Sequence, residues 1–378
     1  MVTRLRLVSL ASSFAVMLTV VAAAAAAAAA SADAAPAAAE DSSPSGDSVF
    51  VADPAVAADP LDDGFARGMT VSCPTWGPIW GSDAMRSSLA ELKELGVDWV
   101  SIHPYAQIDR SGTVRYAATA DTPFLRRAVE IARAADIHLF WKPHLAYWGS
   151  FDWRGTIEFG DDEAAWRRFF TSYRAFIVDQ ARFAEAAGVP LFAVGLEYEA
   201  TTHHEADWRR LIQAVRAVYS GRITYAANWD RLDDVPFWDA VDLIGVQAYF
   251  PLGAADAAPD VAAFRQAWDA PLARLEALST RYDKPVLFAE IGYDLAEHAA
   301  AEPWRTQRGR RASPRALALR AALMRAALER VPEAPHVVGM FWWKWIPGRP
   351  GRHDFPMEHP EAREILRSAW RDTALSGR

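Results

Sequence analysis

The feature that most constrains the fold is a repeat that begins near residue 64. Short apolar runs rich in Val, Ile, Phe and Trp alternate with polar loops and with segments of helical periodicity. Eight such runs cover residues 68–76, 97–105, 137–145, 190–198, 222–229, 241–250, 285–293 and 337–345. Eight β/α units in roughly 300 residues predict an α/β fold, a (β/α)8 TIM barrel that forms a single catalytic domain. The alternative is an open doubly wound sheet, which usually has a glycine-rich phosphate loop after its first strand, and "CPTWGPIWGS" is not one.

The segments between the runs predict amphipathic helices. One apolar stripe at helical spacing consists of Met85, Leu89 and Leu92. A second consists of Trp208, Leu211, Ile212 and Val215. Ser313 followed by Pro314 predicts the start of the last helix between strands, with serine as the N-cap. The stretch "DRLDDVPFWDA" after the fifth run is short, and it predicts a helix of a single turn.

The N-terminus has the pattern of a secretory signal peptide. Residues 1–35 contain two early arginines, a long apolar stretch and small residues of the Ala-x-Ala type, with cleavage expected between Ala32 and Ala39. Residues 36–63 are rich in Ala, Pro, Ser and Asp and predict a flexible linker, so the folded domain is expected to span 64–372. We expect a secreted or periplasmic protein without membrane contact; the alternative is an uncleaved anchor that tethers it to the cell envelope.

Composition excludes some functions and favours another. The net charge is −8 and Lys and Arg form no large block, since the basic run 305–315 lies in a predicted surface loop, so nucleic acid is not expected as a partner. Cys73 is the single cysteine, which excludes an intrachain disulfide and a cysteine-based zinc site. Sixteen tryptophans favour a carbohydrate ligand, because flat rings stack on pyranose faces. We expect a monomer that needs no cofactor or metal.

Chemistry in a TIM barrel lies at the C-terminal ends of the strands. The side chains expected there are Trp76, His103, Tyr105, Lys142, His144, Tyr147, Glu197, Asn228, Trp229, Gln247, Tyr249, Glu290, Trp343 and Trp345. Two carboxylates, Glu197 on the fourth strand and Glu290 on the seventh, should face each other across the barrel mouth. Counting back by two gives Gly195 from the first and Phe288 from the second, so alternation predicts that both acids line the barrel.

A facing pair of carboxylates is what glycoside hydrolysis needs. One carboxyl donates a proton to the leaving oxygen and the other attacks the anomeric carbon, with retention of configuration when they are about 5 Å apart. We predict Glu197 as acid/base and Glu290 as nucleophile, with Tyr249 orienting Glu290. The predicted substrate-binding residues are Trp76, His103, Lys142, His144, Asn228, Trp229, Tyr249, Trp343 and Trp345, where Lys142, His144 and Asn228 bind hydroxyls and Trp343 or Trp345 forms the floor.

Several motifs together resemble glycoside hydrolase family 113. These are "KPH", "GLEYEATT", "VQAYFPL", "FAEIGY" and "FWWKW", and the resemblance covers about residues 68–348. It implies a retaining TIM-barrel glycosidase with β-1,4-mannanase or β-mannosidase activity, with Glu197 as acid/base and Glu290 as nucleophile. Leu196 stands where many members of the wider clan, though not family 113, have the asparagine that binds the sugar 2-hydroxyl. Asn228 is therefore our candidate for that contact.

Two other functions are compatible with parts of the sequence. A metal-dependent hydrolase would use His103, His144, His203 and His204, but the first strand lacks His-x-His and the last two are adjacent, as expected in a loop or at a helix start. A carbohydrate-binding barrel without catalysis would normally have lost a carboxylate, and both are present. The sugar stays open among β-mannan, β-glucan, β-galactan and glucomannan, as does endo or exo cleavage. The aromatic loop 146–162 is expected to line distal subsites or to pack on itself.

Overall fold

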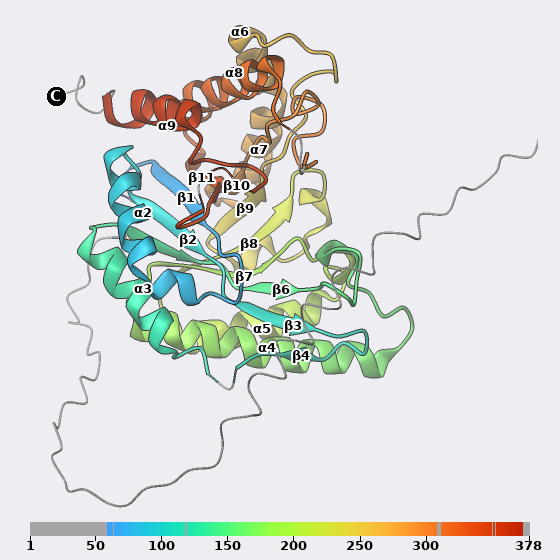
Figure 1. The fold of residues 1–378 in the computed structure, drawn as a ribbon. Helices are drawn as coiled ribbons and strands as arrows, with labels where there is room; N and C mark the ends of the chain where they lie inside the picture. The colour runs from blue at the N-terminus through green and yellow to red at the C-terminus, as the bar shows by residue number, and fades with distance from the viewer. Residues whose placement is uncertain are drawn as a thin grey trace, which may run out of the picture. The chain divides into compact units, whose positions relative to one another are not determined.

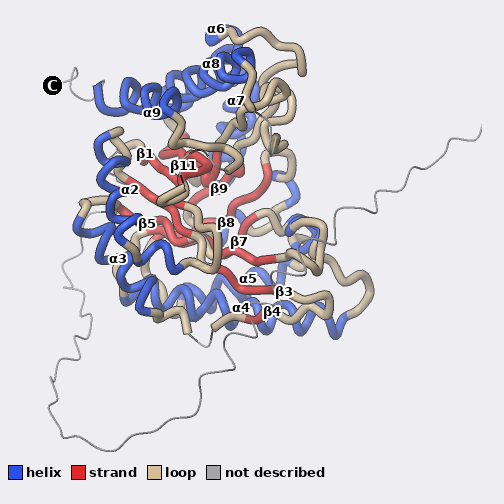
Figure 2. Tube along the Cα trace, viewed as in Figure 1, coloured by secondary structure: helices blue, strands red, loops and turns tan. Residues whose placement is uncertain are grey.

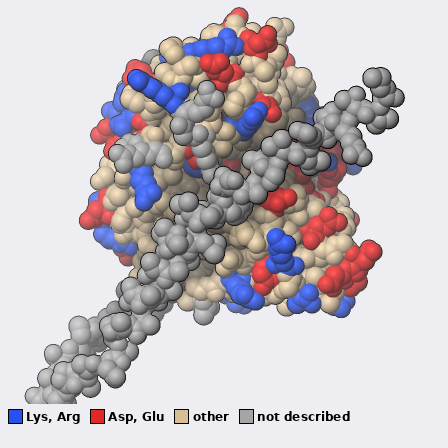
Figure 3. Space-filling model, turned by 45° about the vertical axis from the view of Figure 1, so that its right-hand side comes forward, with Lys and Arg blue, Asp and Glu red and all other residues tan. Residues whose placement is uncertain are grey.

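A computed structural model of the chain describes residues 59–372, apart from residues 63, 118, 308–310, 350 and 352. The predicted signal peptide and almost all of the predicted linker lie outside the described residues. Among the described residues, none of the helices combines the length and the hydropathy that crossing a bilayer requires. On the face drawn in Figure 3, acidic and basic side chains are interspersed and do not gather by sign.

Eight parallel strands close into a barrel, which confirms the predicted TIM fold (Figure 1). The strands are β1 (Ala66–Val71), β2 (Trp99–Ile102), β5 (His138–Trp141), β7 (Leu191–Leu196), β8 (Arg222–Asn228), β9 (Leu243–Gln247), β10 (Val286–Ile291) and β11 (Val337–Trp345). Their order around the barrel is β1-β11-β10-β9-β8-β7-β5-β2, so every strand pairs with its neighbours in sequence among the eight. Seven of the eight predicted apolar runs contain one of these strands, and β1 begins two residues before the run 68–76.

Helices surround the barrel (Figures 1 and 2). They are α2 (Asp83–Glu94), α3 (Pro123–Ala134), α4 (Glu163–Ala186), α5 (Glu205–Arg216), α6 (Val261–Ala267), α7 (Asp269–Tyr282), α8 (Pro314–Arg330) and α9 (Pro360–Leu366). Both predicted stripes are buried, in α2 and α5. The helix α8 begins at Pro314 as predicted, and the Ser313 hydroxyl accepts a hydrogen bond from the Ala316 backbone N–H at 3.1 Å. Two short 3-10 turns, η4 (Leu232–Asp234) and η5 (Trp238–Ala240), replace a full helix between β8 and β9.

The barrel interior is a packed core rather than a pore. The ring of Phe341 on β11 lies 5.1 Å from that of Phe140 on β5 and 6.4 Å from that of Trp99 on β2, so side chains meet across the barrel. Gly68 on β1 makes room for this ring, since a Cβ there would lie 2.4 Å from Phe341. The mouth above this core is therefore the part of the barrel that can bind a ligand.

A small second sheet was not predicted. It consists of β3 (Tyr105–Ile108), β4 (Val114–Arg115) and β6 (His144–Ala146) in the order β4-β3-β6. Two of the predicted apolar runs continue from barrel strands into this sheet, and each run is divided by a proline, Pro104 or Pro143, which has no N–H for the ladder. The small sheet thus carries Tyr105 and His144 just beyond the ends of β2 and β5.

Candidate active site

Glu290 is held by groups that come from the barrel strands and their ends. Lys142, directly after β5, places its Nζ 2.6 Å from Oε1 of Glu290 and also donates to the Ala289 carbonyl at 3.0 Å. The Tyr249 hydroxyl, two residues after β9, donates to Oε2 at 3.0 Å, which confirms the predicted contact. The Lys142 side chain is 0% exposed, so protein atoms already hold the ammonium that was predicted to bind sugar hydroxyls. Burial lowers the pKa of Lys142, and Glu290 opposes this shift.

Glu197 has a different environment. It follows the last residue of β7 with a φ of 54°, in the left-handed region that a non-glycine residue rarely adopts. Its side chain is 16% exposed, and Nη1 of Arg154 lies 3.2 Å from Oε2. Burial raises the pKa of Glu197 to about 7, opposed by the Arg154 charge and assisted by the nearby Glu290. The Gln247 amide lies beside the carboxyl and favours its ionised form, although this amide makes no hydrogen bond within the described residues.

Strand alternation, which predicted that Glu197 faces the barrel interior, does not hold along β7. A Cβ on Gly195 would lie 2.7 Å from the Trp208 ring of α5, so Gly195 faces the helix layer and not the barrel interior. The pairing of β7 with β8 shifts between Ala193 and Gly195, which marks a β-bulge. A bulge inserts one residue into a strand, so Ala193 before it and Gly195 after it face opposite sides. Glu197 is turned toward the mouth by its left-handed backbone and not by a regular count of two.

The same correction applies to Glu290. The Phe288 ring stacks 5.8 Å from that of Trp268, which lies between α6 and α7, so Phe288 also faces the helices. Pairing of β10 with β9 shifts between Phe288 and Glu290, and this second bulge turns Glu290 inward. The two carboxylates are near enough for the Glu290 charge to raise the pKa of Glu197, but the strand parity offered for their direction is wrong.

Three rings stack beside the carboxylates. His103 lies 4.6 Å from His144 with an interplanar angle of 20°, and His144 lies 6.4 Å from Trp343 at 14°. Both imidazoles are buried, and both nitrogens of His103 and Nε2 of His144 make no hydrogen bond within the described residues. Burial lowers the pKa of each histidine well below its usual range, helped by Lys142 and Arg154. Neutral imidazoles can each donate and accept one hydrogen bond, which suits a ligand with hydroxyl groups.

Trp343 and Trp345 lie in different layers. The ring of Trp343 is 5.5 Å from Nζ of Lys142, which places it beside the Glu290 ion pair. Trp345 is 3% exposed, and the Arg363 guanidinium of α9 lies 5.7 Å from its ring, so it faces the helices. The pairing of β11 with β1 shifts along this stretch, and the two tryptophans therefore do not share a face. The predicted floor role fits Trp343, and the prediction for Trp345 is wrong.

The remaining predicted residues lie around the mouth. Nδ2 of Asn228 donates to Oε1 of Glu199 at 2.5 Å, so the amide is anchored two residues beyond Glu197. The Trp229 ring stacks 5.8 Å from that of Trp304. Trp76 is 54% exposed and contacts Tyr105 edge-on at 6.0 Å.

Sequence reasoning missed Arg154, which lies in a 3-10 turn, η2 (Arg154–Thr156), of the loop 146–162. This loop was expected to line distal subsites or to pack on itself, but it reaches the carboxylates, because Arg154 contacts Glu197 and its Nη1 also lies 3.4 Å from Nδ1 of His144. Nothing in the local pattern separates Arg154 from other surface arginines. Arg154 meets the Glu197 carboxylate only because the fold places this loop over the end of β7.

The histidines of the metal alternative do not assemble. His203 and His204 pack on Trp166 of α4, with ring centroids 5.6 and 4.0 Å away, and His204 precedes α5 as its N-cap. His103 and His144 lie elsewhere, in the ring stack with Trp343. Among the described residues, no three His, Cys, Asp or Glu side chains are arranged to hold a metal ion.

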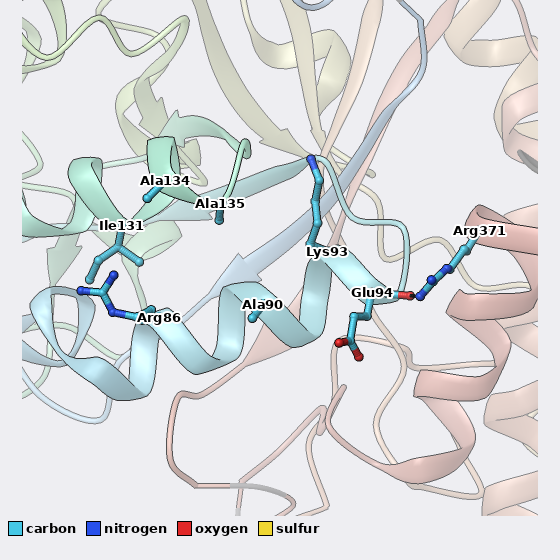
Figure 4. A pocket seen from close by; sticks show the side chains of 8 residues that line it. All are labelled: Arg86, Ala90, Lys93, Glu94, Ile131, Ala134, Ala135 and Arg371. Carbon is cyan, nitrogen blue, oxygen red and sulfur yellow. Dashed lines mark hydrogen bonds between the residues drawn. The ribbon is translucent and has the colours of Figure 1, made fainter.

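A separate hollow of about 640 Å³ lies on the outside of the barrel between α2 and α3 (Figure 4). Its cations already have partners: Nζ of Lys93 lies 3.0 Å from the Asp136 carboxylate, and Arg371 donates to the Glu94 carbonyl at 2.8 Å. None of the active-site residues lines this hollow, so it makes no contribution to the site at the mouth.

Comparison with known proteins adds an independent finding. The sequence model of Glycoside Hydrolase Family 113 matches residues 70–354. The GH113 β-mannanase AaManA from Alicyclobacillus acidocaldarius, solved in complex with ManMIm, is 27% identical, with a TM-score of 0.70 over 82% of this chain and 98% of that one. A GH113 β-1,4-mannanase solved as a complex has the same fold, at 23% identity and a TM-score of 0.71 over 81% of this chain and 99% of the other. No curated protein matches the chain.

Proposed function

The chain belongs to glycoside hydrolase family 113, and on this premise we propose that it cleaves β-1,4-linked mannose-containing polysaccharides or oligosaccharides by double displacement with retention. As a family member it is a glycoside hydrolase that acts on O-glycosyl bonds. The substrate is proposed because the solved relative at 27% identity is a β-mannanase. The observation that carries the mechanism is the contrast between the two carboxylates, since pairs of acids in unlike environments take unlike roles.

Glu290 is the proposed nucleophile. Two donors, the Lys142 ammonium at 2.6 Å and the Tyr249 hydroxyl at 3.0 Å, point at its two oxygens. This arrangement is complementary to an ionised carboxylate and fixes the direction of attack. In the first step an oxygen of Glu290 bonds to the anomeric carbon while the bond from that carbon to the glycosidic oxygen breaks.

Glu197 is the proposed acid/base. Its pKa of about 7 keeps a large protonated fraction near neutral pH, so it can give its proton to the leaving oxygen as the bond breaks. In the second step the ionised Glu197 takes a proton from water, the water oxygen bonds to the anomeric carbon, and Glu290 leaves. Arg154 at 3.2 Å favours the ionised form that this second step requires.

The sugar that becomes bonded to Glu290 is proposed to lie over Trp343. His103 and His144 are free to hydrogen-bond its hydroxyls through their unpartnered nitrogens. Asn228 stays our candidate for the 2-hydroxyl, the group whose configuration distinguishes mannose from glucose. This subsite needs no cofactor, because both proton and nucleophile come from side chains.

We further propose that the enzyme acts outside the cytoplasm after removal of residues 1–35. The support is the arginine, apolar and small-residue pattern of this segment. N-terminal sequencing of the protein recovered from the medium or periplasm tests it. An intact N-terminus in the membrane fraction would favour the tethered alternative.

Product analysis tests the mechanism. Wild type is incubated with β-mannan, β-glucan, β-galactan and glucomannan, and the first-formed anomer is followed by proton NMR. We expect β-anomeric products from β-mannan, and a loss on the order of 10⁴-fold or more for Glu290→Gln. First-formed α-anomers would exclude double displacement. Folded Glu197→Gln and Glu290→Gln proteins with near-normal rates would overturn the site, and binding without turnover by wild type would favour a non-catalytic barrel.

A further inference from the structure

Glu199 is a third carboxylate near the site, two residues beyond Glu197, and the mechanism proposed above does not use it. Nδ2 of Asn228 donates to its Oε1 at 2.5 Å. An ionised carboxylate only accepts hydrogen bonds, so the amide must turn its nitrogen toward Glu199. The opposite orientation would set two acceptors against each other at this short distance. Glu199 therefore fixes which way the Asn228 amide faces.

The side-chain oxygen of Asn228 remains available to a ligand, since within the described part of the chain Oδ1 accepts no hydrogen bond. Asn228 is the last residue of β8 and pairs in register with Gln247 of β9, which in turn pairs with Glu290. On its other side, the Glu197 backbone N–H donates to the Ala226 carbonyl at 2.9 Å. Asn228 thus lies in the row of strand ends between the proposed acid/base and the proposed nucleophile, where the attacked sugar is proposed to bind.

Both partners of this hydrogen bond are held by the loop after β8. The Arg231 backbone N–H donates to the Asn228 carbonyl at 2.9 Å, and Nε of the same arginine lies 3.6 Å from Oε2 of Glu199. Glu199 itself begins the 3-10 turn η3 (Glu199–Thr201), and the Thr202 hydroxyl donates to its backbone carbonyl at 2.9 Å. The orientation of the amide is thus set before a sugar binds, which lowers the entropy cost of binding.

The electrostatic surroundings of Glu199 also direct it toward Asn228. Burial raises the pKa of Glu199, and the Asn228 amide opposes this shift. Arg154 of η2, a turn that packs against η3, is already engaged by Glu197 at 3.2 Å. The charged groups of the loop after β8 that face Glu199 are Asp230, Arg231 and Asp234. Because the oxygen that makes its side-chain hydrogen bond faces Asn228, Glu199 acts on a bound sugar through that amide.

We propose that Glu199 is a positioning residue for the attacked sugar, because it holds the Asn228 amide with Oδ1 placed to accept a hydrogen bond from the sugar 2-hydroxyl. Nδ2 of Asn228 has a second N–H, so donation by the amide nitrogen to the sugar is the alternative that an experiment must separate. This inference rests on the proposed function and deepens it, because it adds a residue, itself not in contact with the sugar, on which the proposed mannose contact depends.

The first test compares two substrates that differ by one hydroxyl. One is an aryl β-mannobioside; the other is the same compound without the 2-hydroxyl on the sugar that carries the aryl group. For Glu199→Ala we expect kcat/KM on the bioside to fall about tenfold, the effect of one hydrogen bond that is no longer oriented. The value on the deoxy analogue should stay within about twofold of wild type, because that substrate has no 2-hydroxyl to lose. A purely structural role of Glu199 would instead lower both values equally.

The second test reverses the hydrogen bond. Asn228→Asp alone sets two carboxylates against each other, so kcat/KM on the bioside should fall on the order of 10²-fold at pH 7. Part of this loss relative to wild type should be regained at pH 5, because two facing carboxylates share a proton as pH falls.

The double variant Asn228→Asp with Glu199→Gln lets the amide donate from position 199 to the carboxylate at position 228. An acceptor oxygen still faces the sugar and the net charge of the pair is unchanged, so kcat/KM should return to within about fivefold of wild type. If the sugar were held by an N–H of Asn228, the double variant could not recover, because position 228 would have no donor.

Matched variants complete the design. Glu205→Ala removes another carboxylate of the same stretch, one that pairs with Arg209 at 2.7 Å, and should change neither substrate. Glu199→Gln can still accept from Asn228 and should keep most of the wild-type rate. An equal loss on both substrates for Glu199→Ala, or a double variant no faster than Asn228→Asp alone, would overturn the inference. If wild type cleaves neither the bioside nor β-mannan, the proposed function itself fails, which is a different result.

Discussion

The surroundings of Glu290 come from the barrel strands, whereas those of Glu197 come in part from a long loop. Lys142 directly follows β5 and its ion pair with Glu290 is buried, with exposed fractions of 0% and 6%. Arg154 reaches Glu197 from the loop 146–162, and this pair keeps exposed fractions of 13% and 16%. The proposed nucleophile, Glu290, needs one charge state and one direction, which rigid strands provide. The proposed acid/base, Glu197, must change its charge during turnover, and a loop arginine at the rim can adjust its acidity without disturbing the barrel.

The largest effect expected from breaking this contrast is the loss of the proton donor. Glu197→Gln should lower kcat/KM on mannan oligosaccharides by about 10²–10⁴-fold, the usual contribution of general acid catalysis. The first step should be much less affected with an aryl mannoside whose leaving group needs no proton. Burst kinetics on both substrates measure the rate of the first step. An equal fall in that rate on both substrates would contradict the acid role of Glu197.

On the strand side, Lys142→Met should leave Glu290 buried without its partner. We expect a fall of about 10²-fold in kcat and a stability loss of about 3–5 kcal/mol, because one charge of a buried pair is left uncompensated. Thermal unfolding and single-turnover rates measure the two effects separately. The double variant Lys142→Met with Glu290→Gln should regain much of the stability, since the stranded charge is gone; strictly additive losses would argue against coupling.

The pH profile should depend on Glu197. In the proposed mechanism the active free enzyme needs this carboxyl protonated, and its raised pKa means that the proton is lost as pH rises through about 7. We therefore expect kcat/KM to fall above pH 7, approaching tenfold per pH unit. Glu197→Gln should abolish this alkaline limb, and a limb that persists in that variant would assign it to another group.

A smaller effect is expected from changing Arg154, the loop residue that contacts Glu197. Arg154 lowers the pKa of Glu197, so Arg154→Gln should move the alkaline limb to higher pH by up to about one unit. The second step should slow by a few-fold, because the ionised base is less favoured. Arg154→Lys serves as the charge-conserving control and should keep most of the wild-type profile. An unchanged limb in Arg154→Gln would mean that the loop does not tune the acid.

The smallest effect is expected at Trp345, which faces α9 and lies outside the site. Trp345→Phe should leave kcat/KM within about twofold and lower stability by about 1 kcal/mol through lost packing. Trp343→Phe, at the ring stack, should instead raise KM. Steady-state kinetics of the two variants side by side check the assignment, and a larger catalytic loss for Trp345→Phe would reverse it.

Much of this site was predictable because hydrophobic periodicity records which segments are strands. The eight apolar runs located the barrel, and the ends of the fourth and seventh runs located Glu197 and Glu290. The contact between Tyr249 and Glu290 followed from the same reasoning. Arg154 was not found, because it comes from a loop whose course depends on contacts far away in the sequence.

The sequence by itself determined that eight strands carry their polar ends to one mouth, since strand periodicity and turn residues are local properties. Only the tertiary structure decided where each end residue points. The counts of two through Gly195 and Phe288 predicted inward faces, yet both residues face the helices, because a bulge in β10 separates Phe288 from Glu290 and a left-handed backbone turns Glu197 away from the side that Gly195 faces. A bulge is set by pairing with the neighbouring strand and leaves no periodic mark in its own sequence. Side-chain direction at the strand ends therefore belongs to the folded barrel.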